Sequence, residues 1–207
     1  MWLLNGQSHH SAVVAFKDRL VLIEAPQSEA RSLAVIAKAR ELRPGTPLTH
    51  LVMTHHHFDH SSGLRAAVAE GLTVITHEGN EAFVKEMAAR PFTRVSDVLE
   101  KAKRPLSVQP VAASHMLTDG TRTMELHHVA GNPHTETMLM AWLPRERILI
   151  EADAFSPGDG PSGSYHPYAA NLLAHIERLK LNVTTIVPLH GSVVTLKDLM
   201  AVARPPS

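Results

Sequence analysis

Apolar residues along the chain switch between the spacing of β-strands and that of helices. The runs Ala12 to Phe16 and Arg19 to Glu24 are apolar and β-branched, with a two-residue polar turn between them, which predicts a β-hairpin. Ser28 is a candidate N-cap, and the helical spacing after it stops at Pro44-Gly45. Leu48 to Thr54 then has the composition of a buried strand, so the first part of the chain predicts strand–helix–strand units.

The rest of the chain continues this alternation. Three further helices are predicted at Glu78 to Arg90, Asn171 to Leu181 and Thr195 to Ala203. Further strands are predicted at Leu72 to Thr76, Leu106 to Ala112, Arg122 to Val129, Thr137 to Leu143, Arg147 to Glu151 and Val183 to Val187. The basic segment Pro91 to Pro105 is expected to be a solvated helical insert, with a lid as the alternative. The segment Phe155 to Ala169, rich in Pro, Gly and Ser, is expected to be a loop.

Length and composition narrow the class of protein. A chain of 207 residues suits a single domain over 1–207, and contents of 44% apolar and 19% charged residues are typical of a soluble globular protein. The formal net charge is zero, so no nucleic-acid partner is expected. No apolar run reaches the ~20 residues of a membrane helix, so no membrane partner is expected either. The chain has no Cys, which excludes disulfides and thiolate ligands but leaves the compartment open between cytoplasm and periplasm.

The stretch Thr54 to Gly63 carries the chemistry. It contains the pattern His-X-His-X-Asp-His, with its metal-type side chains at His55, His57, Asp59 and His60. Imidazole and carboxylate are the usual ligands of zinc, and also of iron and manganese. These four residues lie too close in sequence to share one ion comfortably, so two adjacent ions are predicted.

With this motif the chain resembles the metallo-β-lactamase-fold superfamily. Three later residues stand in the order that the family uses for its remaining ligands: His134, Asp153 and His190. The resemblance implies a four-layer αββα sandwich, an α/β (α+β) fold. It also implies two Zn²⁺ ions, with iron or manganese as alternatives. His55, His57 and His134 would hold one ion, Asp59, His60 and His190 the other, and Asp153 would bridge them.

The resemblance implies a hydrolase that acts on a small carbonyl substrate. Two cations about 3.5–4 Å apart lower the pKa of a shared water, and the resulting hydroxide attacks an electrophilic carbonyl. Asp59 would also orient that nucleophile. An ester, lactone, thioester or amide is the expected substrate, with a β-lactam as a weaker choice because the chain lacks the Cys of the best-known antibiotic-hydrolysing members. A lactonase-like activity fits the ligand set.

Several residues near the motif have weaker assignments. Thr54 is a candidate hydrogen-bond partner for a ligating imidazole. Glu24 stands where family members often carry an Asp that supports the metal site. Because Glu is one methylene longer than Asp, the sequence leaves open whether Glu24 gives the same support. Five further histidines have no spacing that favours a function: His9, His10, His77, His115 and His175.

The segment after Asp153 is the expected place for substrate specificity. Tyr165, His166 and Tyr168 are candidates to donate a proton to an oxyanion or a leaving group. The alternative is that these rings pack against a surface loop.

Three other functions stay open at this stage. A phosphodiesterase or nuclease uses the same metals, although the neutral net charge speaks against it. Diiron oxidoreductases share the fold, and a non-enzymatic metal-binding role is the third alternative. The sequence does not indicate an oligomeric state.

Overall fold

The computed structural model describes residues 1–158 and 165–204. The chain divides into two compact units, an N-terminal unit Met1–Ala112 and a C-terminal unit Ala113–Ser207. Each unit contains a six-stranded mixed sheet and helices, which confirms the predicted α/β class. The single domain expected over 1–207 stays a prediction. In the part of the chain that the structure describes, no helix is long and hydrophobic enough to cross a bilayer.

The sheet of the N-terminal unit has the strand order β1-β2-β3-β4-β5-β6. Its strands are β1 (Trp2–Leu4), β2 (Ser11–Ala15), β3 (Leu20–Ile23), β4 (Leu48–Val52), β5 (Thr73–His77) and β6 (Val108–Val111). The first three strands are antiparallel, and β3 to β6 run parallel to one another. The carboxyl ends of β3, β4 and β5 therefore meet at one edge, which is where open α/β sheets carry their sites.

Helices follow the parallel strands of this unit. They are α1 (Glu29–Leu42), α2 (Phe58–Ser61), α3 (Leu64–Ala69), the 3-10 turn η1 (Glu78–Asn80), α4 (Glu81–Ala89) and α5 (Val98–Ala102). Ser28 caps α1 by accepting a hydrogen bond from the Arg31 amide, as predicted. Leu20 and Leu22 of β3 pack with Val35 and Ile36 of α1 in one apolar cluster, while the intervening Val21 lies outside it. This alternation is the period of two expected of a strand with one face turned to helices.

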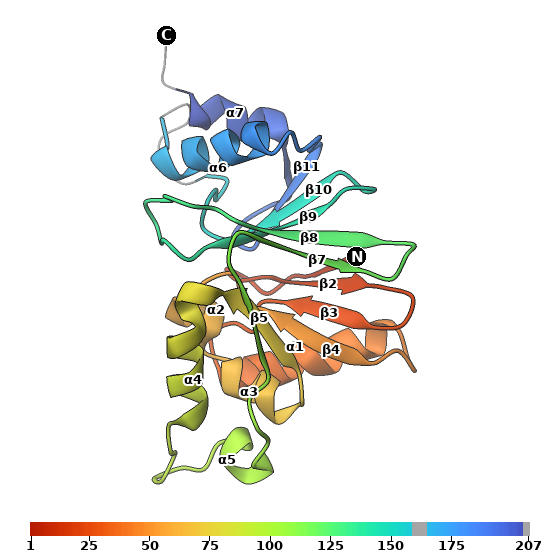
Figure 1. Cartoon of the computed structure of the whole chain (residues 1–207), viewed down its shortest axis with the longest axis vertical. Coiled ribbons are helices and arrows are strands. Elements are labelled where there is room, and N and C mark those ends of the chain that lie inside the picture. The colour runs from red at the N-terminus through yellow and green to blue at the C-terminus, as the bar shows by residue number, and fades with distance from the viewer. Residues whose placement is uncertain (159–164, 205–207) are drawn as a thin grey trace. The chain divides into compact units, whose positions relative to one another are not determined.

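The C-terminal unit has the strand order β12-β11-β10-β9-β8-β7. Its elements are β7 (Ser114–Thr118), β8 (Thr123–His128), β9 (Leu139–Leu143), β10 (Ile148–Glu151), α6 (Pro167–Arg178), β11 (Thr185–Pro188), β12 (Val194–Thr195) and α7 (Leu196–Ala203). Only β10 and β11 pair in parallel within this described sheet. Helices α6 and α7 lie side by side at the C-terminal end of the chain (Figure 1).

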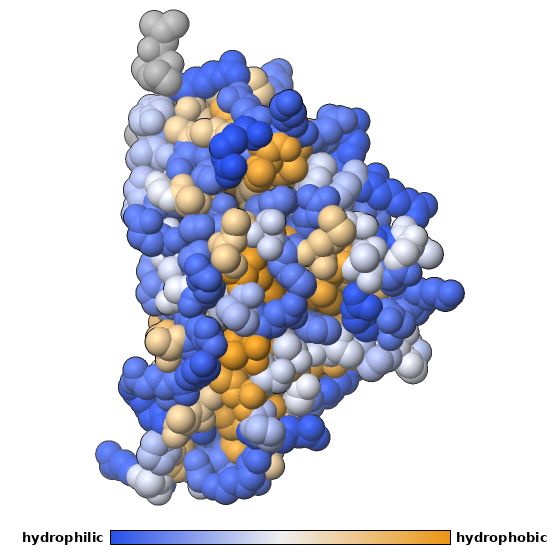
Figure 2. Space-filling model, in the orientation of Figure 1, coloured by the Kyte–Doolittle hydropathy of each residue, from blue (hydrophilic) through white to orange (hydrophobic). Residues whose placement is uncertain are grey.

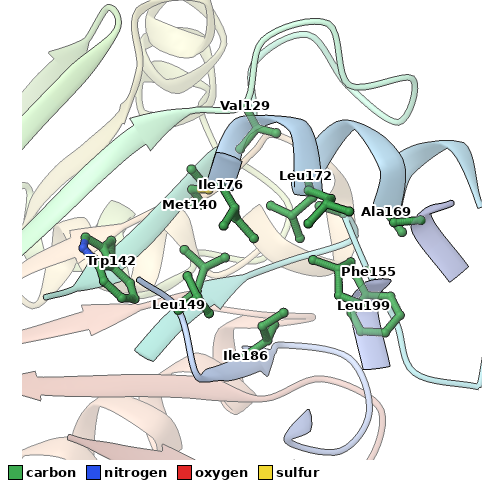
Figure 3. Packing of buried hydrophobic residues seen from close by; sticks show 14 of the residues in the cluster. Val129, Met140, Trp142, Leu149, Phe155, Ala169, Leu172, Ile176, Ile186 and Leu199 are labelled. Atoms are coloured by element: carbon green, nitrogen blue, oxygen red, sulfur yellow. The ribbon is translucent and has the colours of Figure 1, made fainter. Parts of the chain in front are cut away.

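The core of the C-terminal unit lies between its sheet and these two helices. Figure 3 shows Leu172 and Ile176 of α6 directed toward Leu149 of β10 and Met140 of β9, and all four are in one buried cluster. Each large apolar side chain buried in this way stabilises the fold by about 1.5–3 kcal/mol relative to exposure. This packing fixes the strands from which the ligand-bearing loops emerge.

The structure departs from the sequence prediction at a few elements. Strands β1 and β7 were not predicted, because Trp2–Leu4 is only three residues long and Ser114–Thr118 is mostly polar. Helix α6 begins at Pro167, four residues before the expected start at Asn171, because Pro is well tolerated in the first turn. Residues 159–164 of the predicted loop lie outside the described residues.

The basic insert over 91–105 carries α5 and packs onto its own unit. Arg65 of α3 binds the Asp97 carboxylate, with Nη2 to Oδ1 at 3.0 Å, and its Nη1 donates to three carbonyls near the end of α4. Figure 2 shows mainly hydrophilic side chains on the visible face, with hydrophobic ones gathered over the part of this unit where Figure 1 places α3 and β5.

Candidate metal site

The N-terminal unit gathers the four side chains of the His-rich motif at the end of β4. After β4 the chain enters the four-residue helix α2, which contains Asp59 and His60. The ring centroids of His55 and His57 lie 4.7 Å apart, and those of His55 and His60 lie 4.3 Å apart. The Nε2 atom of His60 lies 3.5 Å from Oδ2 of Asp59. The motif is thus a compact group of nitrogen and oxygen donors.

Glu24 orients one of these imidazoles. It follows β3 at the same sheet edge, is fully buried, and accepts a hydrogen bond from Nδ1 of His60 at 3.0 Å. Its other oxygen accepts from the Thr54 amide at 2.9 Å. Because Nδ1 donates to Glu24, the lone pair of His60 is on Nε2, the atom that faces Asp59. The longer side chain of Glu therefore supplies the hydrogen-bonded support that the sequence left unassigned.

Thr54 contacts a second imidazole, a role for which the sequence made it a candidate. Its hydroxyl lies 3.0 Å from Nδ1 of the buried His55. His56 is turned differently, since its ring makes an edge contact with Phe83 of α4 at a centroid distance of 5.7 Å. His56 therefore has a packing contact outside the group of metal-type side chains.

His9 belongs to the same group, which the sequence did not predict. Its Nε2 lies 2.9 Å from Oδ2 of Asp59, and the donor atoms of His9, Asp59 and His60 all lie within 4.8 Å of one another. His9 lies 50 positions before Asp59 in the chain, between β1 and β2, so no local spacing could have indicated this proximity.

The C-terminal unit brings together its three predicted ligands. Asp153 places Oδ2 at 2.9 Å from Nε2 of His134 and Oδ1 at 3.0 Å from Nε2 of His190. Each carboxylate oxygen of Asp153 therefore lies close to a different imidazole.

The pairing of β10 with β11 explains why Asp153 and His190 meet. These parallel strands end in register at Glu151 and Pro188, and each ligand comes two residues later in its own chain segment. Asp153 has a φ of 62°, a left-handed conformation that Asp tolerates better than most residues. Glu151 holds this turn because its Oε2 accepts hydrogen bonds from the amides of Ala154 and Phe155, both at 3.0 Å. This role of Glu151 was not predicted.

The aromatic candidates of the C-terminal unit take different positions. The Tyr168 ring makes an edge contact with His134 at 5.6 Å, and His166 contacts Tyr168 at 5.0 Å. Tyr165 is 47% exposed. Their proposed roles toward substrate stay predictions, and Tyr168 is the one whose ring contacts a candidate ligand.

The donor chemistry of both groups suits a divalent cation. Neutral imidazoles with an anchored Nδ1 and an available Nε2, accompanied by carboxylates, are the ligands that zinc prefers. In the N-terminal unit the lone pair of His60 Nε2 faces a carboxylate oxygen, and a cation satisfies two such acceptors at once. The His and Asp clusters therefore fit a metal site.

Comparisons with solved structures identify the fold. Solved structures that resemble the chain include the DIM-1 metallo-β-lactamase, with a TM-score of 0.71, 19% identity and coverage of 94% of this chain and 85% of that one. A metallo-β-lactamase from Pontibacter korlensis has a TM-score of 0.72 at 18% identity, covering 94% and 85%. One from Hirschia baltica has a TM-score of 0.68 at 15% identity, covering 96% and 87%. At these identities the likeness shows the fold alone.

The sequence itself identifies the family. No curated protein matches the chain. The family model described as the metallo-β-lactamase superfamily matches residues 4–190, a span that includes every predicted metal ligand. The chain therefore belongs to the metallo-β-lactamase superfamily.

Proposed function

We propose that this protein is a metal-dependent hydrolase with two metal ions, acting on a small carbonyl substrate. The observation that carries the proposal is the position of Asp153, whose two carboxylate oxygens lie 2.9 and 3.0 Å from Nε2 atoms of two different histidines. A carboxylate placed between two imidazoles in this way suits a bridge between two cations. Membership of a family built around metal-dependent hydrolysis supports the same function.

The ligands divide into two sets in this proposal. One set is His55, His57 and His134; the other is Asp59, His60 and His190, with Asp153 shared. The anchored imidazoles of His55 and His60 support these assignments within the N-terminal unit. The Asp153 contacts support those of His134 and His190 within the C-terminal unit.

The chain's own residues supply orientation and proton handling. A pair of Zn²⁺ ions, when bound, supplies an activated water and a Lewis acid for the carbonyl oxygen. Asp59 carries a carboxylate that is 38% exposed, so it can accept a proton from water or direct its approach. Glu24 and Thr54 hold their imidazoles in fixed orientations, which lowers the reorganisation needed during reaction.

An ester, lactone or thioester with an apolar acyl group is the proposed substrate. Phe58 lies between His57 and Asp59 in the motif, and this large apolar residue is 73% exposed. The proposal takes this ring, which neighbours two predicted metal ligands in the chain, as the contact for the apolar part of the substrate. The net charge of zero favours neutral substrates over polyanions.

A hydrolysis panel tests the proposal. Esters, lactones, thioesters, β-lactams and phosphodiesters are offered to zinc-loaded protein, to metal-free protein and to the Asp59→Ala variant. Asp18→Ala is the matched control, because Asp18 is an exposed carboxylate of the same unit at the β2–β3 turn. We expect the zinc-loaded wild type and the zinc-loaded Asp18→Ala variant to cleave carbonyl substrates. The metal-free protein and the Asp59→Ala variant should not cleave them.

Two results would contradict the proposal. Hydrolysis that persists after metal removal would refute the dependence on metal. Cleavage confined to phosphodiesters would show that the substrate is a phosphate ester and not a carbonyl compound. Metal analysis of the same samples gives the number of ions bound.

A further inference from the structure

The loop between β1 and β2 is held in place by several hydrogen bonds. The amide of His9 donates to the carbonyl of Gly6 at 3.2 Å, and the Gly6 amide donates to Nδ1 of the buried His10 at 3.1 Å. Nη2 of Arg31, from α1, donates to the carbonyl of His9 at 3.2 Å. The backbone that carries His9 is therefore fixed on both sides.

Gly6 shows how closely this loop is packed. A Cβ atom at that position would lie 1.3 Å from Nη2 of Arg31 and 2.4 Å from the carbonyl oxygen of His9. The second contact is with backbone, which cannot move aside cheaply. Only Gly allows the Arg31 guanidinium to reach the His9 carbonyl.

Gln27 connects His9 to the motif through two separate contacts. Its side-chain Nε2 lies 2.9 Å from Nδ1 of His9. Its backbone amide donates to the carbonyl of Asp59 at 3.0 Å. One residue thus sets the relative positions of His9 and Asp59.

Two neighbours of Nδ1 bear on the tautomer of His9: the Gln27 amide nitrogen at 2.9 Å, which can only donate, and the Ser8 hydroxyl at 2.7 Å, which can donate or accept. With Nδ1 accepting from Gln27, the ring proton is on Nε2. That N–H points at Oδ2 of Asp59, which lies 2.9 Å away. His60 has the opposite tautomer, because its Nδ1 donates to Glu24.

We propose that His9 is a positioning residue of the metal site, which holds the carboxylate of Asp59 by donating a hydrogen bond to it. The inference rests on the proposed function, since it takes Asp59 as a metal ligand. The two imidazoles beside Asp59 then have different tasks. His60 offers a lone pair to metal, whereas His9 restrains the carboxylate that shares that metal.

Metal affinity measured without substrate tests this role. Zinc binding is measured by competition with a chromophoric chelator for wild type, His9→Ala and His9→Gln. His115→Ala is the matched control, because His115 is a β7 histidine that the sequence also left without a role. We expect His9→Ala to weaken the affinity for one zinc equivalent by about 10–100-fold, the usual effect of losing a residue that supports a ligand. His9→Gln keeps an amide donor near the position of Nε2 and should restore most of the affinity.

Long-range ¹H–¹⁵N spectra of the zinc-loaded protein separate a positioning residue from a ligand. The signal absent from His9→Gln identifies His9, and we expect it to show a proton on Nε2. A zinc-coordinated Nε2 at His9 would overturn the proposal, as would unchanged zinc affinity in His9→Ala. Equal loss of affinity in the Gln and Ala variants, with unchanged thermal unfolding of the metal-free proteins, would also overturn it.

This test can fail independently of the proposed function. If no substrate of the panel were hydrolysed, the enzyme assignment would be refuted. The zinc affinity of the protein and the tautomer of His9 could still be measured, because neither depends on activity. If the protein hydrolyses a panel substrate but His9→Ala leaves the zinc affinity unchanged, the enzyme assignment would stand and the positioning role of His9 would be refuted.

Discussion

Glu24 Oε2 accepts a hydrogen bond from Nδ1 of His60 at 3.0 Å, and neither side chain has more than 2% of its surface exposed. A buried carboxylate in this position fixes the imidazole and makes it a better ligand. Glu24 has a φ of 72°, so the backbone also adopts a left-handed conformation to place this group.

The Glu24→Gln variant should therefore bind zinc more weakly. We expect an affinity loss of about 10–100-fold for one equivalent. The amide presents an NH₂ group where Thr54 N or His60 Nδ1 needs an acceptor, so a loss of about 1–3 kcal/mol in the free energy of unfolding is expected as well. Chelator competition and chemical denaturation measure the two effects. Glu41→Gln, at an exposed site on α1, is the control. Zinc affinity equal to wild type would show that the Glu24 contact does not tune the ligand.

The Asp153→Asn variant tests the bridge. Asn tolerates the left-handed conformation with φ of 62°, so the substitution changes charge with little change of backbone. We expect activity on the best panel substrate to fall by roughly 100-fold or more, the scale of losing one electrostatic group at a reaction centre. The control is Asp119→Asn, in the turn between β7 and β8. Metal content is measured on the same samples, and two retained ions with full activity would exclude the bridging role.

The Phe58→Ala variant should change selectivity and leave stability almost unchanged. The ring is 73% exposed, so its removal should alter the free energy of unfolding by no more than about 0.5 kcal/mol. If the ring covers an apolar acyl group, the ratio of kcat/KM for hexanoyl and acetyl esters should fall by about 10-fold or more. Val95→Ala, at a position 79% exposed in the same unit, is the control. An unchanged ratio would remove Phe58 from the substrate contact.

The Arg65–Asp97 pair predicts a pH-dependent contribution to stability. The hydrogen bond from Arg65 holds the pKa of Asp97 below its usual range, although burial acts in the opposite direction. A carboxylate with a lowered folded-state pKa contributes stability above its unfolded pKa of about 3.9 and loses it as the pH falls through the folded value. Asp97→Asn should cost about 1–3 kcal/mol near neutral pH, the scale of a hydrogen bond to a charged group that is partly buried.

Denaturation of wild type and Asp97→Asn from pH 7 to acid measures this effect. The difference between the two proteins should be constant near neutrality and shrink below about pH 4. A difference that stays the same to the lowest pH at which both proteins fold would show that the pair acts through packing alone.

His175 predicts a second pH effect, of a different origin. Burial lowers the pKa of this imidazole, and Arg178, His127 and His128 lower it further, against the hydrogen bond to the Ala130 carbonyl at 2.9 Å. The unfolded chain therefore takes up a proton near pH 6.5 before the folded protein does, so stability falls as the pH drops below about 6.5.

The His175→Gln variant keeps a donor for the Ala130 carbonyl and removes the titrating group. Its free energy of unfolding should decline less than that of wild type between about pH 6.5 and 5. Parallel curves for the two proteins over this range would contradict the assignment.

Much of the fold could be read from the sequence because its signals are local. The hairpin of β2 and β3 and the Ser28 cap of α1 depend on neighbouring residues. The four donors between His55 and His60 were recognisable for the same reason, since they fall within six positions of one loop. Strand β7 was missed because its polar sequence, Ser-His-Met-Leu-Thr, gains its strand conformation by pairing with β8.

The sequence by itself determined which residue types can bind metal and the order in which they occur. The tertiary structure decided which groups surround them. The in-register ends of β10 and β11 bring Asp153 and His190 together, and the ends of β3 and β4 bring Glu24 to His60. His9 reaches Asp59 from 50 positions away through a loop held by Gly6, Arg31 and Gln27. Such contacts depend on sheet register and loop anchoring, which are set by packing across the whole unit.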